Sequence, residues 1–429
     1  MKLVQLKKKN LEKRLNGLRR ETTLSDPHIE SSVRKIVEDV RKNGDAALFK
    51  YTEKFDRLEL SRRTVKVSNK EVEEAKSLVS EEIKSNLALA SKRIRDYQEK
   101  KLPHEKTFTD SMGNELGWVI RPIERVGIYV PGGKAAYPST VLMTAIPAKV
   151  AGVEEIILVT PCPNGEINPT VLVAASMAGV DAIHKVGGAQ AVAALAFGTQ
   201  SIPKVDKIVG PGNIYVTVAK KLVFGAVDID MIAGPSEVLI ISDGSSPAGW
   251  IAADLLAQAE HDEMAVPVLV TNSLEFAKNV KKEVVNRLKG LERKEIAKEA
   301  VKNQGKIFVV DSIDDAVSVA NAFAPEHLEL CVENPKSILP KIKHAGAIFM
   351  GSTSTEAFGD YVAGPSHVLP TGGTARFSSP LSVYDFLRMP SLISISESGF
   401  KELRQSVINL AYSEGLEAHA LSVKARFNG

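Results

Sequence analysis

Gln258 and His261 are the first residues in this chain whose types and spacing suggest metal chemistry. They stand three positions apart at the end of residues 247–261, Pro-Ala-Gly-Trp-Ile-Ala-Ala-Asp-Leu-Leu-Ala-Gln-Ala-Glu-His, which the sequence predicts to be a helix. Ser246 suits the cap of this helix and Pro247 its first turn. With about 3.6 residues per turn, an amide oxygen and an imidazole at this spacing lie on one face and can share an ion. Considered alone, such a pair is more often exposed at a surface than bound to a metal.

Further side chains that bind metals stand in two glycine-containing segments downstream. Asp360 lies in the segment 359–367, which also contains His367, and a C-terminal segment provides Glu414 and His419. An Asp oxygen and a second His would complement the amide and imidazole of the predicted helix. Together they form a mixed nitrogen and oxygen set that suits zinc and leaves room for substrate atoms to join the ion.

Glu326 and His327 form a second candidate pair, within Ala-Pro-Glu-His-Leu-Glu-Leu at the start of a predicted strand. Adjacent strand residues point to opposite faces, but in the turn before the strand both side chains can reach one cleft. An imidazole exchanges protons near neutral pH and a neighbouring carboxylate can activate water, so the pair suits acid/base catalysis. On these residues alone, a surface turn is the simpler interpretation.

Three glycine-rich turns, each between a predicted strand and a predicted helix, suggest nucleotide binding. They are Pro131-Gly132-Gly133, Gly187-Gly188-Ala189-Gln190 and Gly210-Pro211-Gly212-Asn213. Glycine lets backbone N–H groups approach phosphates at a helix N-terminus. Tyr129, Gln190 and Asn213 stand beside the turns, where they can meet a nicotinamide or a ribose. The Gly-x-Gly-x-x-Gly fingerprint is absent, so ordinary tight turns explain the glycines equally well.

The elements that position these residues alternate between strands and helices from residue 126 onward. Buried apolar runs are predicted as strands, and glycine turns lead from three of them into helices. This alternation is typical of a parallel sheet with helices on both faces, and ligands of such sheets collect beyond the carboxyl ends of the strands. The pattern repeats after residue 236. We therefore predict an α/β fold with two similar Rossmann-like parallel-sheet domains and small N-terminal and C-terminal helical appendages.

The predicted domain boundaries follow this repeat. A helical stripe before Asn43 and the capping box Ser68-x-x-Glu71 predict helices in the first hundred residues. The predicted parts are an N-terminal helical arm over 1–24, a first α/β domain over 25–106 and 236–382 with the metal and catalytic residues, a second α/β domain over 107–235 with the NAD-binding turns, and a C-terminal helical tail over 383–429. We expect the arm to pack on a partner subunit or on the body of the protein.

The composition is that of an ordinary soluble globular protein, because 44% of the 429 residues are hydrophobic and 25% are charged. The 55 Lys and Arg nearly balance the 52 Asp and Glu, which favours a small-molecule substrate over nucleic acid or membrane. Cys162 and Cys331 lack the close spacing of a zinc or redox motif and fit a reducing compartment. Since the sequence predicts neither a membrane span nor a signal peptide, we expect a cytoplasmic protein.

Taken in order, these segments resemble the histidinol dehydrogenase family over essentially the whole chain. The resemblance rests on Gly-Pro-Ser-Glu-Val at 234–238, Gln-Ala-Glu-His at 258–261, Ala-Pro-Glu-His-Leu at 324–328, the 360–367 loop and Glu-Gly-Leu-x-Ala-His at 414–419. It implies that zinc is held by Gln258, His261, Asp360 and His419, and that the acid/base residues are Glu326 and His327. It also implies NAD contacts for Tyr129, Gln190 and Asn213. The substrate contacts that it implies are Ser236, His367 and Glu414, together with His327 and the four zinc ligands.

By the same resemblance, the expected reaction is the last step of histidine biosynthesis. L-histidinol would be oxidised to L-histidine through the aldehyde, a four-electron oxidation that uses two NAD and one water. One zinc ion per subunit would orient the substrate and would not generate the nucleophile. His327 would accept the alcohol proton, and Glu326 with His327 would activate water. The subunits of this family form homodimers, so His419 and Glu414 of the tail would complete the partner's site.

Three other functions fit parts of the pattern. A zinc hydrolase would activate water at the metal and would need no NAD. A relative that oxidises another polar alcohol would keep the zinc ligands and the Glu326–His327 pair but would change His367 and Glu414. A non-catalytic nucleotide-binding protein would give the metal-type residues no common role. Largely because of the resemblance, oxidation of L-histidinol is the favoured interpretation.

Overall fold

The computed structural model describes residues 1–18, 27–132 and 136–426. The chain divides into two units, a larger one of residues 1–101 and 123–385 and a smaller one of residues 102–122 and 386–429. Within the described ranges, no helix combines the length and the apolar character that a membrane crossing requires. Cys162 and Cys331 are buried free thiols.

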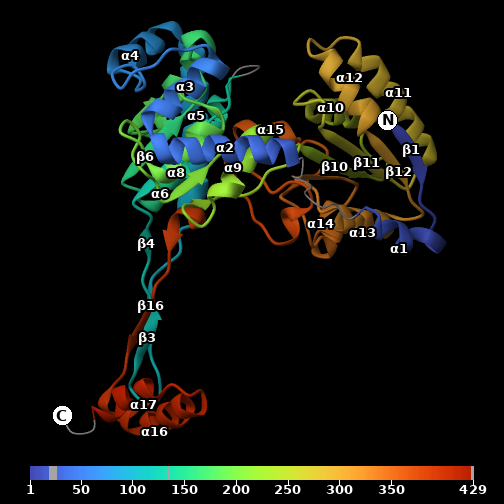
Figure 1. The fold of residues 1–429 in the computed structure, drawn as a ribbon. Coiled ribbons are helices and arrows are strands. Elements are labelled where there is room, and N and C mark those ends of the chain that lie inside the picture. The colour runs from blue at the N-terminus through green and yellow to red at the C-terminus, as the bar shows by residue number, and fades with distance from the viewer. Residues whose placement is uncertain (19–26, 133–135, 427–429) are drawn as a thin grey trace. The chain divides into compact units, whose positions relative to one another are not determined.

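The first sheet of the larger unit has six parallel strands in the order β1-β12-β11-β10-β13-β14 (Figure 1). Its two central strands are buried along their whole length, as expected for apolar strands that helices cover on both faces. The strands are β1 (Lys2–Gln5), β10 (Glu237–Ser242), β11 (Val266–Thr271), β12 (Lys306–Val309), β13 (His327–Cys331) and β14 (Ala347–Met350).

Helices pack on both faces of this sheet because successive residues of its strands point to opposite sides. Leu239 of β10 lies in a core with residues of α1 and α13, whereas the next residue, Ile240, lies in a core with residues of α10, α11 and α12. The helices of this region are α1 (Lys8–Asn16), α10 (Ala248–Ala259), α11 (Leu274–Leu288), α12 (Lys294–Asn303), α13 (Ile313–Phe323), α14 (Pro335–Ile338) and α15 (Glu356–Tyr361).

The second sheet of the larger unit has five parallel strands in the order β7-β6-β5-β8-β9. Each of the strands β5 to β8 is followed by a helix, as the alternating pattern predicts. The elements are β5 (Arg125–Tyr129), α6 (Pro138–Ala151), β6 (Glu155–Val159), α7 (Pro169–Ala178), β7 (Ala182–His184), α8 (Gly188–Phe197), β8 (Lys207–Val209), α9 (Ile214–Val223) and β9 (Asp228–Ile229). Two parallel sheets flanked by helices confirm the predicted α/β class.

The four helices between residues 27 and 99 pack on the helices of the second sheet. They are α2 (Pro27–Asn43), α3 (Asp45–Asp56), α4 (Asn69–Leu78) and α5 (Glu81–Glu99). α2 contacts α8 and α9, while α4 and α5 contact α6 and α7 in the pairs α4 with α7, α5 with α6 and α5 with α7. The predicted grouping of 25–106 with 236–382 is therefore not the one observed.

The predicted capping box at the start of α4 is confirmed. The Ser68 hydroxyl accepts a hydrogen bond from the Glu71 N–H, and the Glu71 carboxylate accepts one from the Ser68 N–H. A second helix, α5, follows directly, and Ser80 caps it by accepting a hydrogen bond from the Ile83 N–H. Local capping chemistry thus sets the starts of both helices.

The N-terminal arm begins with a strand. β1 pairs in parallel with β12, from Lys2 opposite Lys306 to Gln5 opposite Val309, and α1 then packs on α13. The arm predicted over residues 1–24 is therefore helical only in part and packs on the body of its own chain. Residues 19–24 lie outside the described residues.

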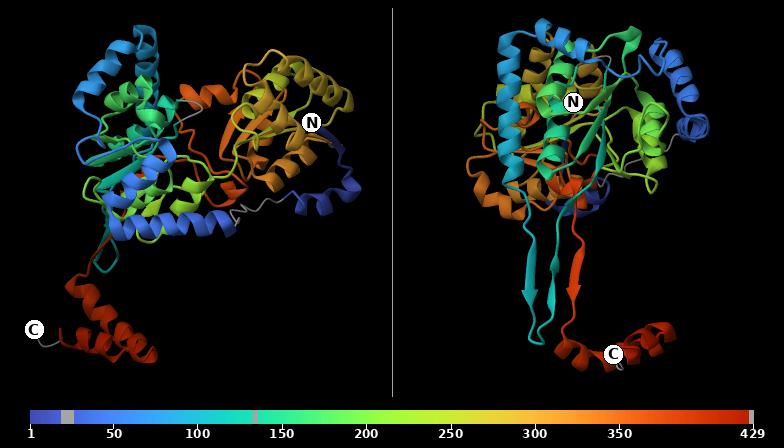
Figure 2. Two further views of the ribbon diagram at one scale, coloured as in Figure 1. Left: turned by 45° about the horizontal axis from the view of Figure 1, so that its top comes forward. Right: turned by 90° about the vertical axis from the view of Figure 1, so that its left-hand side faces the viewer.

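The smaller unit is built from two distant segments of the chain. β2 and β3 form a hairpin around the turn at Gly113-Asn114, and β16 pairs with the other edge of β3, as the right-hand view of Figure 2 shows. The tail predicted as helical therefore also contains strands, and residues 107–122 belong with it. The elements are β2 (Lys106–Thr109), β3 (Glu115–Trp118), β4 (Arg121–Pro122), β15 (Leu387–Arg388), β16 (Ser391–Ser394), α16 (Glu397–Ser413) and α17 (Glu417–Lys424).

Candidate functional site

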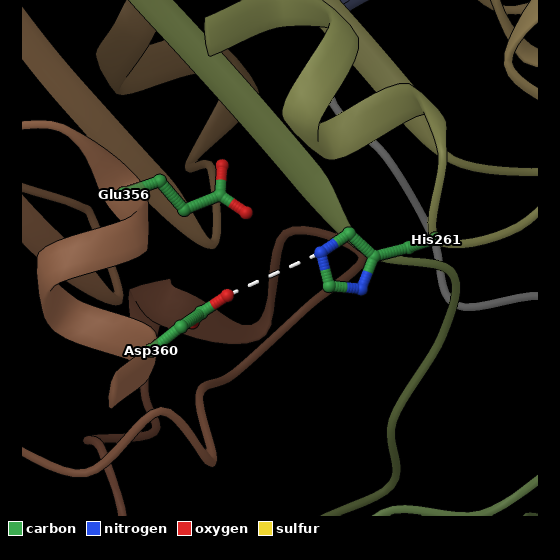
Figure 3. Close-up of side chains that lie close together, drawn as sticks. All are labelled: His261, Glu356 and Asp360. Carbon is green, nitrogen blue, oxygen red and sulfur yellow. Dashed lines mark ion pairs between the residues drawn. The ribbon is translucent and has the colours of Figure 1, made fainter. Parts of the chain in front are cut away.

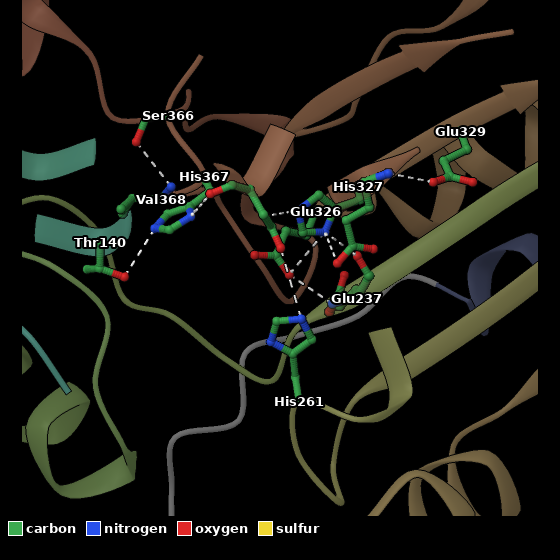
Figure 4. Close-up of polar contacts among 11 residues, drawn as sticks. Thr140, Glu237, His261, Glu326, His327, Glu329, Ser366, His367 and Val368 are labelled. Carbon is green, nitrogen blue, oxygen red and sulfur yellow. Dashed lines mark hydrogen bonds and ion pairs between the residues drawn. The ribbon is translucent and has the colours of Figure 1, made fainter. Parts of the chain in front are cut away.

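The candidate catalytic and metal-binding residues of the larger unit gather at the amino edge of the first sheet (Figure 4). His327 is the first residue of β13, Glu326 directly precedes it, and Ser236 directly precedes β10. His261 lies in the connection from α10 to β11, and Asp360 lies on α15. Because β10 and β13 are parallel neighbours, residues at their starts meet at one edge. The alternation of strands and helices predicted ligands beyond the carboxyl ends of the strands, but these residues lie at the amino edge.

His327 is held in one tautomer. Its Nδ1 lies 3.0 Å from the carbonyl oxygen of Glu237, and because a carbonyl only accepts, Nδ1 carries the hydrogen. The lone pair of the neutral ring is then on Nε2, which lies 3.9 Å from Asp360 Oδ1. Burial lowers the pKa of His327 to about 4, although the charge of Asp360 opposes this effect. The imidazole is therefore neutral at neutral pH, with a basic nitrogen on the side of Asp360, as a general base requires.

The Asp360 carboxylate lies between two imidazoles. Its Oδ2 is 4.0 Å from His261 Nε2, and its Oδ1 is 3.9 Å from His327 Nε2. The backbone carbonyl of Asp360 also accepts a hydrogen bond of 3.0 Å from His367 Nδ1. Three histidines predicted from separate motifs thus meet around one aspartate.

His367 connects this edge of the first sheet to the second sheet. Its Nδ1–H donates to Asp360, and burial lowers its pKa, so in the neutral ring Nε2 accepts a hydrogen bond of 3.1 Å from the Thr140 hydroxyl. Thr140 lies in the first turn of α6, directly beyond the carboxyl end of β5. The amino edge of the first sheet therefore meets the carboxyl edge of the second, where the glycine turns lie.

Gln258 is fully buried in the last turn of α10, and its carbonyl accepts from the His261 N–H at 3.3 Å. The helix is capped by Pro247 without a side-chain hydrogen bond, so Ser246 does not have the capping role that the sequence predicted. Neither amide atom of Gln258 has a hydrogen-bond partner among the described residues. An unpaired buried amide costs about 1–3 kcal/mol, so this side chain suits a bound ligand. Together with His261 and Asp360 it forms a nitrogen and oxygen donor set that fits zinc.

Glu356 is a residue of this site that the sequence analysis missed. Its side chain points toward those of His261 and Asp360, and one ligand atom from each of the three lies within 4.8 Å of the others (Figure 3). The carboxyl group is buried, with Oε1 at 4.0 Å from His327 Nδ1. Its spacing of four residues from Asp360 was a signal, but the segment 359–367 was interpreted as a loop, and no helix was predicted at 356–361.

Burial raises the pKa of Glu326 well above its usual value, although its Oε2 accepts a hydrogen bond of 2.8 Å from the Glu237 N–H. The nearby carboxylates of Glu237 and Asp360 raise this pKa further. A buried carboxyl group whose Oε2 lies 3.8 Å from His327 Nδ1 is placed to exchange protons with a substrate.

Glu329 makes the stability of the protein depend on pH. Burial, and next the charge of Asp254, raise its pKa from 4.5 to about 8. The stability that comes from its proton is therefore complete below about pH 4.5 and is lost as the pH rises through about 8. Gln does not titrate and can still accept from the Glu356 N–H. We expect Glu329→Gln to raise the melting temperature, relative to wild type, by several degrees more at about pH 8 than at about pH 5.

Thermal unfolding of both proteins at the two pH values, with a chelator present, measures this effect. The exposed Glu333→Gln serves as the matched control and should show the same pH dependence as the wild type. A Glu329→Gln difference that is equal at both pH values would contradict the assignment.

The three predicted NAD-binding residues lie at the carboxyl edge of the second sheet. Tyr129 ends β5, and its hydroxyl accepts a hydrogen bond of 3.0 Å from the Gly188 N–H, which joins two of the turns. Gln190, in the first turn of α8, is buried, and its Oε1 has no partner within the described part of the chain. Asn213 is the N-cap of α9 and accepts from two backbone N–H groups of that helix. Gly133 lies outside the described residues.

A buried ion pair holds the third glycine turn. Lys220 and Asp230 pair with side chains that are 4% and 1% exposed. Lys220 Nζ donates to the Gly210 carbonyl at 3.0 Å, and the Gly210 N–H donates to Asp230 at 2.7 Å. Gly210 has a φ of +111°, and a Cβ there would lie 2.1 Å from the Tyr129 carbonyl oxygen, so only glycine fits. The sequence analysis missed this pair because a lone Lys or Asp is usually a surface residue.

Glu414 and His419 belong to the smaller unit. Glu414 is the C-cap of α16 and His419 lies on α17, and both side chains are exposed. Their expected contacts with substrate and zinc, in the site of a partner subunit, stay predictions.

Comparison with known proteins identifies one family over nearly the whole chain. The sequence model of the histidinol dehydrogenase family matches residues 18–427. The chain is 54% identical to the histidinol dehydrogenase of Syntrophotalea carbinolica over 398 residues, 93% of this chain and 92% of that protein. It is 51% identical to that of Aquifex aeolicus over 430 residues, 100% of both. A crystal structure of histidinol dehydrogenase from Elizabethkingia anophelis matches 100% of this chain and 98% of its own, with a TM-score of 0.94 and 37% identity. The chain therefore belongs to the histidinol dehydrogenase family of oxidoreductases.

Proposed function

We propose that this chain catalyses the last step of histidine biosynthesis, in which two NAD and one water take part in the four-electron oxidation of L-histidinol to L-histidine. The observation that carries the proposal is the state of His327. Its imidazole is buried, neutral and held by the Glu237 carbonyl, with a basic Nε2 on the side of Asp360 and His261. The expected cytoplasmic location stays a prediction.

We propose that zinc is held by Gln258, His261, Asp360 and the partner subunit's His419. The unpartnered buried amide of Gln258 and the facing His261 and Asp360 side chains support the first three ligands. When bound, the ion supplies a fixed positive charge that orients the imidazole and amine of the substrate. We propose that Ser236 and His367 contact the substrate beside these ligands.

His327 and Glu326 accept the protons that the substrate and the water release during the reaction. His327 Nε2 accepts the hydroxyl proton of L-histidinol. At the same time a hydride leaves the carbon that bears this hydroxyl for the first NAD, and the product is the aldehyde. Glu326, with His327, then takes a proton from the water that adds to the aldehyde carbon. A second hydride would then leave the carbon of the hydrate, whose two hydroxyl protons pass to solvent, and the product is the carboxylate; bound NAD would supply the hydride acceptor.

NAD binding is proposed for the carboxyl edge of the second sheet. The Tyr129 hydroxyl and the buried Gln190 amide oxygen border the turns that open onto this edge. Asn213 already caps α9, so it would meet the cofactor while holding that helix start in place. The contact between Thr140 and His367 brings this edge to the catalytic histidines, which suits hydride transfer between cofactor and substrate.

We also propose a homodimer in which the C-terminal tail reaches the partner's site. The smaller unit has a buried apolar cluster of only three residues on α16 and α17 within its described part. Large apolar side chains remain exposed on it, among them Ile393, Leu410 and Leu421. Apolar surface that a small unit cannot bury itself is typical of an interface between subunits.

Product counting tests the proposed reaction. Purified protein with zinc, L-histidinol and NAD should form two NADH for each L-histidine. One NADH together with free aldehyde would instead indicate a simple alcohol dehydrogenase. A hydrolysed product without NADH would favour a zinc hydrolase.

A further inference from the structure

Lys220 is a buried charged residue that takes no part in the reaction described above. It lies on α9, and its side chain is only 4% exposed. A charge in such a place destabilises a protein unless it is paired and hydrogen-bonded. Lys220 is both, since it pairs with Asp230 and donates to the Gly210 carbonyl at 3.0 Å. Its ammonium group is therefore committed to the third glycine turn.

Asp230 binds the same turn from the other side. Its carboxylate accepts hydrogen bonds from the Gly210 N–H at 2.7 Å and from the Met231 N–H at 2.6 Å. Both backbone polar groups of Gly210 are thus bound by the ion pair, the N–H by Asp230 and the carbonyl by Lys220. The pair therefore fixes the orientation of the peptide groups on both sides of Gly210.

The orientation of Gly210 decides where the rest of the turn lies. Its φ of +111° belongs to a region that glycine enters freely, and glycine adopts many other conformations equally well. The turn ends at Asn213, which accepts from the Tyr215 and Val216 N–H groups at the start of α9. A turn that is already held in one conformation binds a ligand without the entropic cost of ordering it.

The segment that follows Asp230 leads to the first sheet, and its far end is anchored independently. The Gly234 N–H donates to the Thr371 hydroxyl, and the Ser236 carbonyl accepts from the Val266 N–H at 2.9 Å. Ser236, which directly precedes β10, is therefore held by contacts that do not involve the ion pair. Loss of the pair should disturb the third glycine turn and leave the substrate residues in place.

We propose that Lys220 and Asp230 are positioning residues for NAD, which hold the turn 210–213 in its binding conformation without contacting the dinucleotide. The inference rests on the NAD site of the proposed function and adds two residues that act through the turn. Removal of the Lys220 ammonium leaves the Gly210 carbonyl without its donor, so the turn loosens and NAD binds more weakly. Turnover at saturating NAD is preserved, because His327 lies at the first sheet.

Equilibrium binding of NAD to full-length Lys220→Met tests this inference, because Met has a similar length but no charge and no donor. In calorimetric titration without substrate, the Kd for NAD should rise about 10-fold, as expected for a lost hydrogen bond to a charged group. The KM for NAD should rise with it. The kcat and the KM for L-histidinol should stay within about threefold of the wild type. A merely structural role would instead lower the amount of folded protein and leave the KM for NAD unchanged.

Lys149→Met is the matched control, because Lys149 makes the same arrangement at the opposite edge of the second sheet. Its Nζ donates to Asp181 at 2.8 Å and to the Glu154 carbonyl at 3.4 Å, and Asp181 accepts from the Ile156 N–H at 2.8 Å. Glu154 and Asp181 directly precede β6 and β7, so this pair holds the amino edge, away from the glycine turns. Lys149→Met should leave the Kd for NAD within about twofold of the wild type. An equal loss of NAD affinity in both variants would overturn the inference.

Asp230→Asn carries the test if Lys220→Met does not fold. Asn keeps the shape of Asp and can accept from the Gly210 N–H, but it removes the charge that holds Lys220. Wild-type affinity for NAD in a folded variant of either residue overturns the inference, and so does a wild-type protein that binds no NAD. Affinity for NAD that depends on Lys220 in a protein that forms no L-histidine upholds the inference while the proposed reaction fails.

Discussion

Replacing His327 by Asn is expected to slow the oxidation of L-histidinol about a thousandfold while the zinc content of the protein stays unchanged. The Asn amide can still donate to the Glu237 carbonyl, so the turn before β13 keeps its hydrogen bond. It offers no basic nitrogen on the side of Asp360, and the substrate hydroxyl therefore loses its proton acceptor. Steady-state turnover and metal analysis of the same preparation measure both effects.

His104→Asn is the control for this prediction, because His104 is exposed and lies in the smaller unit. It should turn over at the wild-type rate. Loss of zinc from His327→Asn would show that His327 is a ligand and not the base. A decrease of less than about tenfold would assign the proton transfer to another residue.

Two inactive variants, His419→Ala and His327→Asn, should recover about a quarter of the wild-type activity when their subunits are mixed. Random exchange makes about half of the dimers mixed, and each mixed dimer has one intact site of two. That site combines the His327 of one subunit with the partner's His419. Joint refolding or co-expression with two affinity tags, followed by an assay of NADH formation, measures the recovery.

His261→Asn mixed with His327→Asn is the matched control. Both residues lie in the larger unit of the same chain, so no arrangement of these subunits produces an intact site. This mixture should stay inactive. If the mixture of His419→Ala and His327→Asn also stays inactive, the tail does not serve the partner's site.

Both sheets could be predicted from the sequence because their strands are marked by local composition. The run Val238 to Ile241 is apolar at every position and became the interior of β10, buried on both faces. The same holds for Val126 to Val130, which became β5 and the residue after it. A strand covered on both sides needs only apolar residues in succession, and that property is visible without knowing its neighbours.

The edge of the sheet at which the metal residues lie could not be predicted. His327 Nδ1 and the Glu237 carbonyl are 90 positions apart and meet because β10 and β13 are neighbours. Strand order depends on how the intervening helices cross over the sheet, and no residue of either strand encodes it. The motif Glu326-His327 was therefore recognised, whereas its place at the amino edge was not.

Glu356 was not predicted as a site residue, and the helices α2 to α5 were grouped with the wrong sheet, because both depend on contacts between distant elements. The stripe of Val33, Val37 and Val40 correctly predicted that α2 buries one face. The stripe could not show that this face packs against α8 and α9, because any apolar surface could cover it. Glu356 likewise has no local mark of a site residue until α15 places it four positions from Asp360.

The position of β1 at the edge of the first sheet affects how the protein folds during translation. The strand Lys2 to Gln5 pairs with Lys306 to Val309, which are translated much later, so its backbone groups stay unpaired until β12 has been made. The smaller unit waits longer still, because β3 needs β16 from the end of the chain. A prematurely terminated chain that lacks β12 or β16 would leave strand edges open to aggregation.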